Sequence, residues 1–331
     1  MTKVTLIDVG REAGVSAITV SRALRSPEKV SDSLRAKVEA AVRKLGYVPN
    51  QSASALASSE TNSIVVMIPS MSNHVFTDVL RGIEDALKDT RITLQIGNTG
   101  YDPLEEERIL RSFLNPAPKG VILAGIEQTD EPRSMLANIG VPVVQIMDLS
   151  DAPIGKIVGF SHEKAAISAV QHLLDQGYQK IGFLGAQMDP RSQKRLAGFK
   201  RALQNADLLD EQAIVVTNRP SDVRTGSHLY GKLMQQYPDC DAIFCNNDDM
   251  ALGVLFECQR RGINIPRDFG LCGFNDLGVT AECVPTISTV QTPLFEIGQT
   301  AGTILLKGLE QYPEDTIDLG FKVAPRESSR K

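Results

Sequence analysis

The sequence contains no apolar run long enough to cross a membrane. Its longest apolar stretches, such as residues 64–69, are far shorter than the roughly 20 residues that a membrane-spanning helix needs. The first residues also lack an apolar segment followed by a small-residue cleavage site, so we expect no secretory signal peptide. Both absences favour a cytoplasmic protein.

Residues typical of catalytic centres are equally scarce. The chain has four histidines and no Cys/His metal-ligand spacing, no Gly-x-Ser-x-Gly nucleophile motif and no phosphate-binding P-loop. Its five cysteines are odd in number and lie in apolar segments, which favours buried reduced thiols over disulfides. The Asn247-Asp248-Asp249 triplet could suggest an acidic metal site, but polar capping at a strand end is the simpler interpretation. We expect neither an enzyme nor a bound metal or cofactor.

At 331 residues the chain is too long for one ordinary domain, and its charge is unevenly distributed. Residues 1–50 carry nine Lys or Arg and five Asp or Glu, whereas the remaining residues carry 26 and 35. A basic segment attached to an acidic body is typical of a protein that meets a polyanion such as DNA through one end only.

The basic segment has the pattern of three short helices. Thr5, followed three residues later by Asp8, forms a capping box, and Gly14 ends the helix that it begins. Ser16 and Ser31 can each cap a further helix. The expected helices cover residues 6–13, 17–24 and 32–45. Three short helices with a tight turn between the first two predict a helix-turn-helix.

From Ser63 onward, strand-length apolar runs alternate with amphipathic segments of helix length. Such alternation predicts parallel sheets covered by helices, with ligands at the carboxyl ends of the strands. About ten strands exceed one comfortable sheet, so we expect an α/β core of two similar lobes that face a cleft. The expected strands are 64–68, 93–96, 120–123, 143–147, 157–160, 181–184, 213–216, 242–245, 270–272 and 287–290. The expected helices include 75–88, 103–114, 163–176, 192–205, 223–237 and 250–262.

Several segments match the signature of the lactose/galactose repressor family. They are Val4-Thr5-Leu6-Ile7-Asp8-Val9, Ala13-Gly14-Val15-Ser16, Thr19-Val20-Ser21-Arg22, Val30-Ser31, Leu45-Gly46-Tyr47-Val48-Pro49-Asn50, Leu56-Ala57, Phe160-Ser161, Arg195-Leu196-Ala197-Gly198-Phe199, Asn247-Asp248-Asp249-Met250-Ala251 and Gly273-Phe274-Asn275-Asp276. The matches cover nearly the whole chain. Within the family, the sequence most resembles the gluconate-operon repressors, through segments 68–73, 79–84, 244–249 and 318–321 and through Phe76.

The resemblance implies the domain organisation. An all-α helix-turn-helix head would cover residues 1–46, a hinge segment 47–60, and a core like the periplasmic sugar-binding proteins 61–331. In that core, two parallel-sheet lobes would cover about 61–160 with 293–318, and about 161–290 with 319–331. The sequence ends without the leucine-heptad tail of tetrameric members, which favours a homodimer.

The resemblance also assigns contacts to the bases of operator DNA. Arg22 would donate two hydrogen bonds to a guanine, while Ala17 and Ile18 offer only apolar contact. Leu56, the lone large apolar residue of the Ser/Ala-rich hinge, would enter the minor groove and unstack a base step. The alternative for Leu56 is that it packs back on the core.

Hydroxyl and amide side chains of the head would hold phosphates and set the register of the protein on DNA. For Ser16, Thr19 and Ser31, helix capping is an equally good explanation. The full expected DNA-binding set is Thr5, Leu6, Ser16, Ala17, Ile18, Thr19, Ser21, Arg22, Ser31, Tyr47, Asn50, Ala53, Leu56 and Ala57.

By the same resemblance, a small-molecule effector would bind in the cleft. Asp148 and Asn247 suit ligand hydroxyls, and Phe76 and Phe160 suit apolar ligand faces. The full expected set is Ser70, Asn73, Phe76, Asp148, Phe160, Arg191, Arg195, Asn247 and Asn275.

Three of these residues indicate the charge of the ligand. Arg191 and Arg195 are four residues apart, so they share one helix face, and arginine forks suit carboxylates. Asn275 stands where family members that sense neutral sugars or purines commonly have aspartate, which removes repulsion toward an anion. The alternatives are a solvated Arg191 on an exposed turn and an Arg195 ion pair at the cleft rim. We expect a sugar acid such as gluconate as inducer, with a neutral or phosphorylated sugar as the alternative.

A different class also fits the core. A stand-alone sugar-binding module of a transporter would share the two-lobed core, but it would need a signal peptide and would lack the basic head. The sequence therefore favours a DNA-binding repressor with double-stranded operator DNA and a sugar effector as partners.

Overall fold

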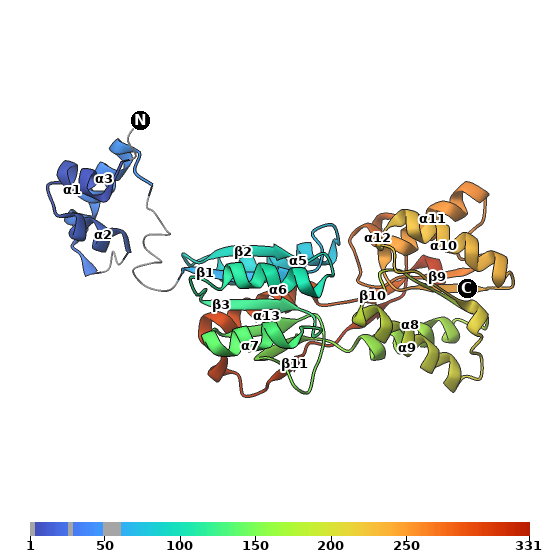
Figure 1. Cartoon of the computed structure of the whole chain (residues 1–331). Helices are drawn as coiled ribbons and strands as arrows, with labels where there is room; N and C mark the ends of the chain where they lie inside the picture. Colours follow the sequence, from blue (N-terminus) through green and yellow to red (C-terminus); the bar gives the residue numbers. More distant parts are fainter. Residues whose placement is uncertain (1–3, 26–28, 49–60) are drawn as a thin grey trace. The chain divides into compact units, whose positions relative to one another are not determined.

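The computed structural model describes residues 4–25, 29–48 and 61–331 (Figure 1). The chain forms two compact units, Met1–Ser59 and Glu60–Lys331. No helix in the described ranges is long and apolar enough to span a membrane. The expected hinge contacts Asn50, Ala53, Leu56 and Ala57 lie outside the described residues.

The first unit contains the three expected helices, α1 (Leu6–Ala13), α2 (Ala17–Arg25) and α3 (Asp32–Leu45). The Thr5 hydroxyl accepts from the Asp8 amide, and the Asp8 carboxylate accepts from the Thr5 amide, which confirms the capping box. Gly14 ends α1 at a φ of 68°, a conformation that glycine adopts without strain. The three helices enclose a small core of six buried side chains, which are Val9, Val20, Ala23, Val38, Ala41 and Tyr47.

The second unit begins with a parallel sheet in the order β11-β5-β4-β3-β1-β2. Its strands are β1 (Ser63–Ile68), β2 (Thr93–Asn98), β3 (Gly120–Ala124), β4 (Val143–Ile146), β5 (Lys156–Gly159) and β11 (Thr316–Asp318). Helices α5 (Val75–Leu87) and α13 (Leu294–Lys307) cover one face, and α6 (Pro103–Phe113) and α7 (Asp130–Ile139) cover the other. We call this sheet and its helices the N-lobe.

Strand β1 shows why the N-lobe strands are continuous apolar runs in the sequence. Ile64, Val66 and Ile68 face α5 and α13, whereas Val65 and Met67 face α6 and α7. All six residues of β1 are buried, as expected for a parallel strand between two helical layers.

A second parallel sheet, in the order β7-β6-β8-β9, forms the C-lobe. Its strands are β6 (Ile181–Gly185), β7 (Ile214–Val216), β8 (Ala242–Cys245) and β9 (Gly270–Cys272). Helices α8 (His162–Asp175) and α9 (Pro190–Asn205) cover one face, and α10 (Val223–Gln236) and α11 (Asp248–Arg261) cover the other. The short helix α12 (Val279–Glu282) follows β9.

The chain passes between the two sheets three times. It leaves the N-lobe after β5 and enters α8, returns after β10 (Thr289–Gln291) to α13, and leaves again after β11 for β12 (Lys322–Ala324). Strands β10 and β12 pair in antiparallel orientation. The expectation of an α/β core with two parallel-sheet lobes is confirmed.

Candidate functional site

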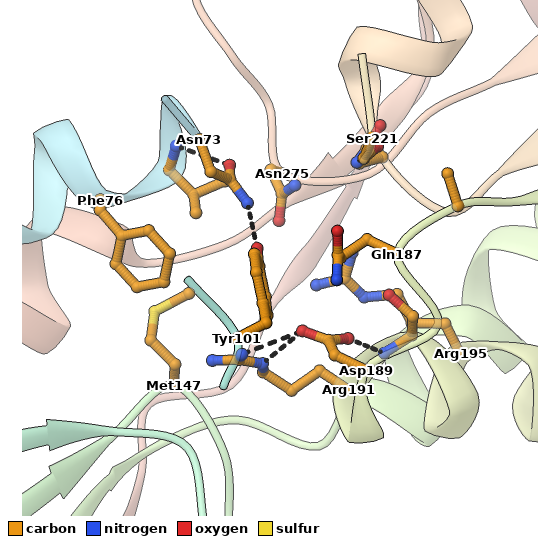
Figure 2. A pocket seen from close by; sticks show the side chains of 14 residues that line it. Asn73, Phe76, Tyr101, Met147, Gln187, Asp189, Arg191, Arg195, Ser221 and Asn275 are labelled. Atoms are coloured by element: carbon orange, nitrogen blue, oxygen red, sulfur yellow. Dashed lines mark hydrogen bonds and ion pairs between the residues drawn. The ribbon is translucent and has the colours of Figure 1, made fainter. Parts of the chain in front are cut away.

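A cavity of about 440 Å³, including its opening to solvent, lies between the N-lobe and the C-lobe (Figure 2). The N-lobe contributes Asn73, Val75, Phe76, Tyr101 and Met147, and the C-lobe contributes Ala186, Gln187, Asp189, Arg191, Ser192, Arg195, Ser221, Asn247 and Asn275. Most of these residues follow the carboxyl end of a strand or begin the next helix, where ligands bind in open parallel sheets.

Backbone strain is concentrated around this cavity. Six non-glycine residues of the described chain have positive φ, and four of them line the cavity: Tyr101 (62°), Met147 (73°), Gln187 (48°) and Asn275 (114°). Such conformations cost about 1–3 kcal/mol each and cluster at ligand sites. The strain therefore indicates a functional cavity rather than an accidental gap in packing.

Arg191 lies in the first turn of α9 and is only 4% exposed, which excludes the solvated turn considered above. Its Nη2 lies 2.9 Å from Asp189 Oδ2 and 3.5 Å from Glu127 Oε1. Although burial acts to lower it, the pKa of Arg191 is raised, because Asp189 and Glu127 stabilise the charged guanidinium. Its Nη1 is buried and has no hydrogen-bond partner, so it can donate to a ligand.

Arg195 lies one turn further along α9 and is 7% exposed. Its Nε donates to His162 Nδ1 at 3.2 Å, its Nη1 donates to the Asn246 carbonyl at 2.5 Å, and its guanidinium carbon lies 3.8 Å from the centre of the Phe274 ring. Burial, reinforced by the neighbouring Arg191, lowers the pKa of Arg195 to about 10. Within residues 61–331, Arg195 forms no ion pair, so the expected rim ion pair is absent.

Amide side chains complete the polar lining. Asn275 is 5% exposed, and its Oδ1 is buried without a hydrogen-bond partner. Asn73 Nδ2 donates to the Tyr101 hydroxyl at 3.3 Å, and Figure 2 shows these two side chains pointing toward each other. Asn247 caps α11 by accepting from the Met250 amide at 3.1 Å, as the simpler interpretation of its acidic triplet predicts. No group of His, Cys, Asp or Glu suited to a metal occurs in the described ranges.

Three residues expected in the effector site do not line the cavity. The Ser70 hydroxyl hydrogen-bonds to that of Ser72 at 3.0 Å. Both Asp148 carboxylate oxygens lie 2.7 Å from Lys194 Nζ, so this carboxylate is already occupied by a cation of the C-lobe. Phe160 is fully buried, 4.4 Å from the His162 ring centre. The other six, Asn73, Phe76, Arg191, Arg195, Asn247 and Asn275, line the cavity.

Sequence reasoning missed eight lining residues, which are Val75, Tyr101, Met147, Ala186, Gln187, Asp189, Ser192 and Ser221. Val75 and Ser192 lie in the first turns of α5 and α9, and the other six follow a strand, which is the one sequence signal that could have indicated them. Asp189 carries a second signal, because an acidic residue before proline is typical of a helix start: Asp189 caps α9 by accepting from the Ser192 amide at 2.8 Å.

In the first unit, the expected DNA-reading side chains of α2 face solvent. Ile18 is 73% exposed, Arg22 is exposed, and Ala17 is half-buried, whereas Val20 of the same helix is fully buried. Ser16 Oγ accepts from the Thr19 amide at 3.1 Å and hydrogen-bonds to its hydroxyl at 2.8 Å, so both residues take part in capping. The Ser31 side chain makes no capping bond to α3.

The remaining expected contacts of the head are placed as follows. Thr5 is exposed but engaged in its capping box, Leu6 and Ser21 are half-buried, and Tyr47 is buried at 9% exposure, with its ring in the head core. Only part of each of these side chains is therefore accessible to a phosphate.

Comparison with known proteins shows what the chain is similar to. Residues 5–50 match the sequence model described as bacterial regulatory proteins, lacI family, and residues 170–329 match a periplasmic binding protein-like domain. The chain is 40% identical to the HTH-type transcriptional regulator GntR of Pseudomonas aeruginosa, over 98% of this chain and 95% of that protein. Identity to GntR of Escherichia coli K12 is 36%, over 97% of each. A LacI-family regulator from Silicibacter pomeroyi has a similar structure, at 38% identity and a TM-score of 0.91, covering 99% and 100%.

Proposed function

This chain belongs to the lacI family of bacterial regulatory proteins, as its sequence motifs predict, and we propose that it is a transcriptional repressor that leaves its operator when a sugar acid binds between its lobes. The relatives that it matches over nearly their whole length are named as transcriptional regulators, which supports a regulatory rather than an enzymatic role.

One observation carries the choice of ligand: the cavity holds two buried guanidinium groups and one carboxylate, Asp189. Asp189 and Glu127 both pair with Arg191, whereas Arg195 forms no direct ion pair among residues 61–331 and is stabilised only by the more distant charge of Asp189. A buried cation without a partner is unfavourable, so an anionic ligand is favoured there over a neutral one. The carboxylate of a sugar acid supplies that charge, and its hydroxyls suit the amides of Asn73, Asn247 and Asn275.

The operator would be read by the head. Arg22 would bind a guanine, and Ala17 and Ile18 would contact neighbouring bases, because these side chains lie on the outer face of α2. The DNA backbone would be contacted by Asn50, Ala53 and Ala57 of the hinge and by seven residues of the head, which are Thr5, Leu6, Ser16, Thr19, Ser21, Ser31 and Tyr47. Leu56 would be the minor-groove wedge. A homodimer would place two heads on two half-sites.

Release would follow from linkage between the two sites. If the acid binds best to a lobe arrangement that the operator-bound dimer does not adopt, it lowers operator affinity, and the operator lowers acid affinity by the same factor.

A calorimetric titration tests the ligand class. We expect gluconate to bind, and glucitol, its neutral counterpart, to bind at least about tenfold more weakly. Arg195→Gln should weaken gluconate binding about 10- to 100-fold, because charge-assisted hydrogen bonds are lost.

Arg201→Gln is the matched control. Arg201 lies on the same helix, but it is exposed and pairs with Glu163 at 2.9 Å, so its loss should change affinity less than about twofold. If a neutral hexose bound more tightly than every sugar acid, the proposal of an acidic effector would be rejected. If a phosphorylated sugar bound more tightly than every sugar acid, the anionic group of the effector would be a phosphate instead of a carboxylate, since arginine also forms paired hydrogen bonds to phosphate.

A further inference from the structure

His162 lies where the chain first passes between the two sheets, since β5 ends at Gly159 and α8 begins at His162. Its side chain is fully buried, with ring centres 4.4 Å from Phe160 and 6.0 Å from Phe274. It is absent from the cavity lining, yet it contacts an arginine that lines the cavity.

The hydrogen bonds of His162 define one tautomer. Nε2 lies 2.7 Å from the Met147 carbonyl, which can only accept, so Nε2 carries the proton. Nδ1 then has a free lone pair, and it accepts from Arg195 Nε at 3.2 Å. Burial and the charge of Arg195 lower the pKa of His162 well below its ordinary value, which keeps the ring neutral and able to accept.

These contacts leave a defined part of Arg195 for a ligand. A guanidinium has five N–H groups. The Nε–H is used by His162, and one Nη1–H is used by the Asn246 carbonyl. The two N–H groups of Nη2 and the second of Nη1 remain. One Nη2–H lies on the Nε side, where the neighbouring Nε–H is already used, so the pair left for the two oxygens of a carboxylate is the end-on pair of Nη1 and Nη2.

We propose that His162 is a positioning residue for the effector site: it holds Arg195 so that the ligand carboxylate binds end-on, across Nη1 and Nη2. This inference rests on the proposed function, in which Arg195 binds the acid. Because Met147 belongs to the N-lobe and Arg195 to the C-lobe, His162 also fixes the arginine relative to both lobes.

Two substitutions test the roles of the two ring nitrogens of His162 separately. The Oδ1 of asparagine comes close to the position of Nδ1 and can accept from Arg195, whereas the amide nitrogen of glutamine comes close to Nε2 and can donate to Met147. We therefore expect His162→Gln to weaken gluconate binding about 10-fold or more, and His162→Asn to retain it within about threefold. A residue that only filled space would give the opposite order, since glutamine is closer to histidine in volume.

The matched control is His172→Gln. His172 lies on the same helix, is half-buried and hydrogen-bonds to Ser329 Oγ at 2.7 Å, away from the cavity. This variant should bind gluconate as wild type does. Operator affinity without ligand should also be unchanged in His172→Gln, because this residue contacts neither the cavity nor the N-lobe.

The experiment is gluconate calorimetry on the full-length wild type and the three variants. Equal affinity of wild type and His162→Gln, or equal losses in the Gln and Asn variants, would overturn the inference while leaving the proposed function in place. A wild type that binds no sugar acid would overturn both.

Nitrogen chemical shifts of the wild-type histidines give a test that does not depend on the folding of a variant. We expect His162 to be protonated at Nε2 alone between pH 6 and 8. Protonation at Nδ1 would overturn the inference, because Nδ1 could not then accept from Arg195.

Discussion

At the scale of residues, the cavity combines unusual backbone conformations with buried charge. Tyr101, Met147, Gln187 and Asn275 hold positive φ, and Arg191 and Arg195 are held nearly without exposure to solvent. Both features cost free energy in the absence of a ligand. The residues are therefore arranged for binding rather than for stability.

The sequence predicts part of this site. The four-residue spacing of Arg191 and Arg195 predicts that they share a helix face, and both lie on α9. It does not predict their burial, which depends on packing of the two lobes against each other. Asp148 illustrates the limit: its position after a strand suggests a cleft residue, but Lys194 from the other lobe pairs with it.

Glu106 provides a pH-dependent prediction at this scale. It is 9% exposed, and burial, assisted by the charge of Glu127, raises its pKa from 4.5 to about 7. A carboxyl group whose pKa is raised by folding contributes stability below its unfolded pKa, and this contribution is lost as the pH rises through the folded value. Stability should therefore decrease between about pH 4.5 and pH 7 on account of Glu106.

Glu106→Gln should remove this loss. We expect the variant to be more stable than wild type at pH 8, by on the order of 2 kcal/mol, with the difference shrinking toward pH 5. Urea unfolding at pH 5 and pH 8 measures this difference in the free energy of unfolding. Glu84→Gln, at an exposed position, is the control. A Glu106→Gln gain that is equal at pH 5 and pH 8 would contradict the assignment.

At the scale of elements, local signals placed the helices of the head well and the core strands nearly as well. The capping box and Gly14 fix both ends of α1, because these bonds are made within one turn of chain. The three-residue strands β11 and β12 have no periodicity of their own, and their pairing partners are distant in sequence, so no local pattern could reveal them. Helix α9 begins two residues before the predicted start, at Pro190.

Ser16 and Ser31 should behave differently despite similar places before a helix. Ser16 caps α2, so Ser16→Ala should destabilise that helix by about 1 kcal/mol and speed exchange of its first amides about fivefold. Ser31 makes no capping bond, so Ser31→Ala should leave exchange in α3 unchanged and weaken operator binding through a lost phosphate contact.

Hydrogen–deuterium exchange of peptides from the full-length chain measures the first effect, and operator titration measures the second. Unchanged exchange in α2 of Ser16→Ala would show that its cap is dispensable, and unchanged operator affinity of Ser31→Ala would remove it from the DNA-contact set.

At the scale of the whole molecule, ion pairs join the two lobes around the cavity. Lys194 with Asp148 and Arg191 with Glu127 connect α9 to the ends of β4 and β3, and His74 lies 3.6 Å from Asp249 at the start of α11. Two of these three contacts are made by α9, the helix that presents both cavity arginines. A ligand that binds these arginines can bias the lobe arrangement through direct contacts.

The most direct test is the affinity of the full-length protein for operator DNA, with and without gluconate. The DNA would be selected from a random pool by the protein itself and measured by fluorescence anisotropy at fixed salt, because phosphate contacts make affinity salt-dependent. We predict that saturating gluconate weakens binding at least about tenfold, that glucitol does not, and that operator DNA weakens gluconate binding by the same factor. Operator affinity that no sugar acid changes would contradict the central claim.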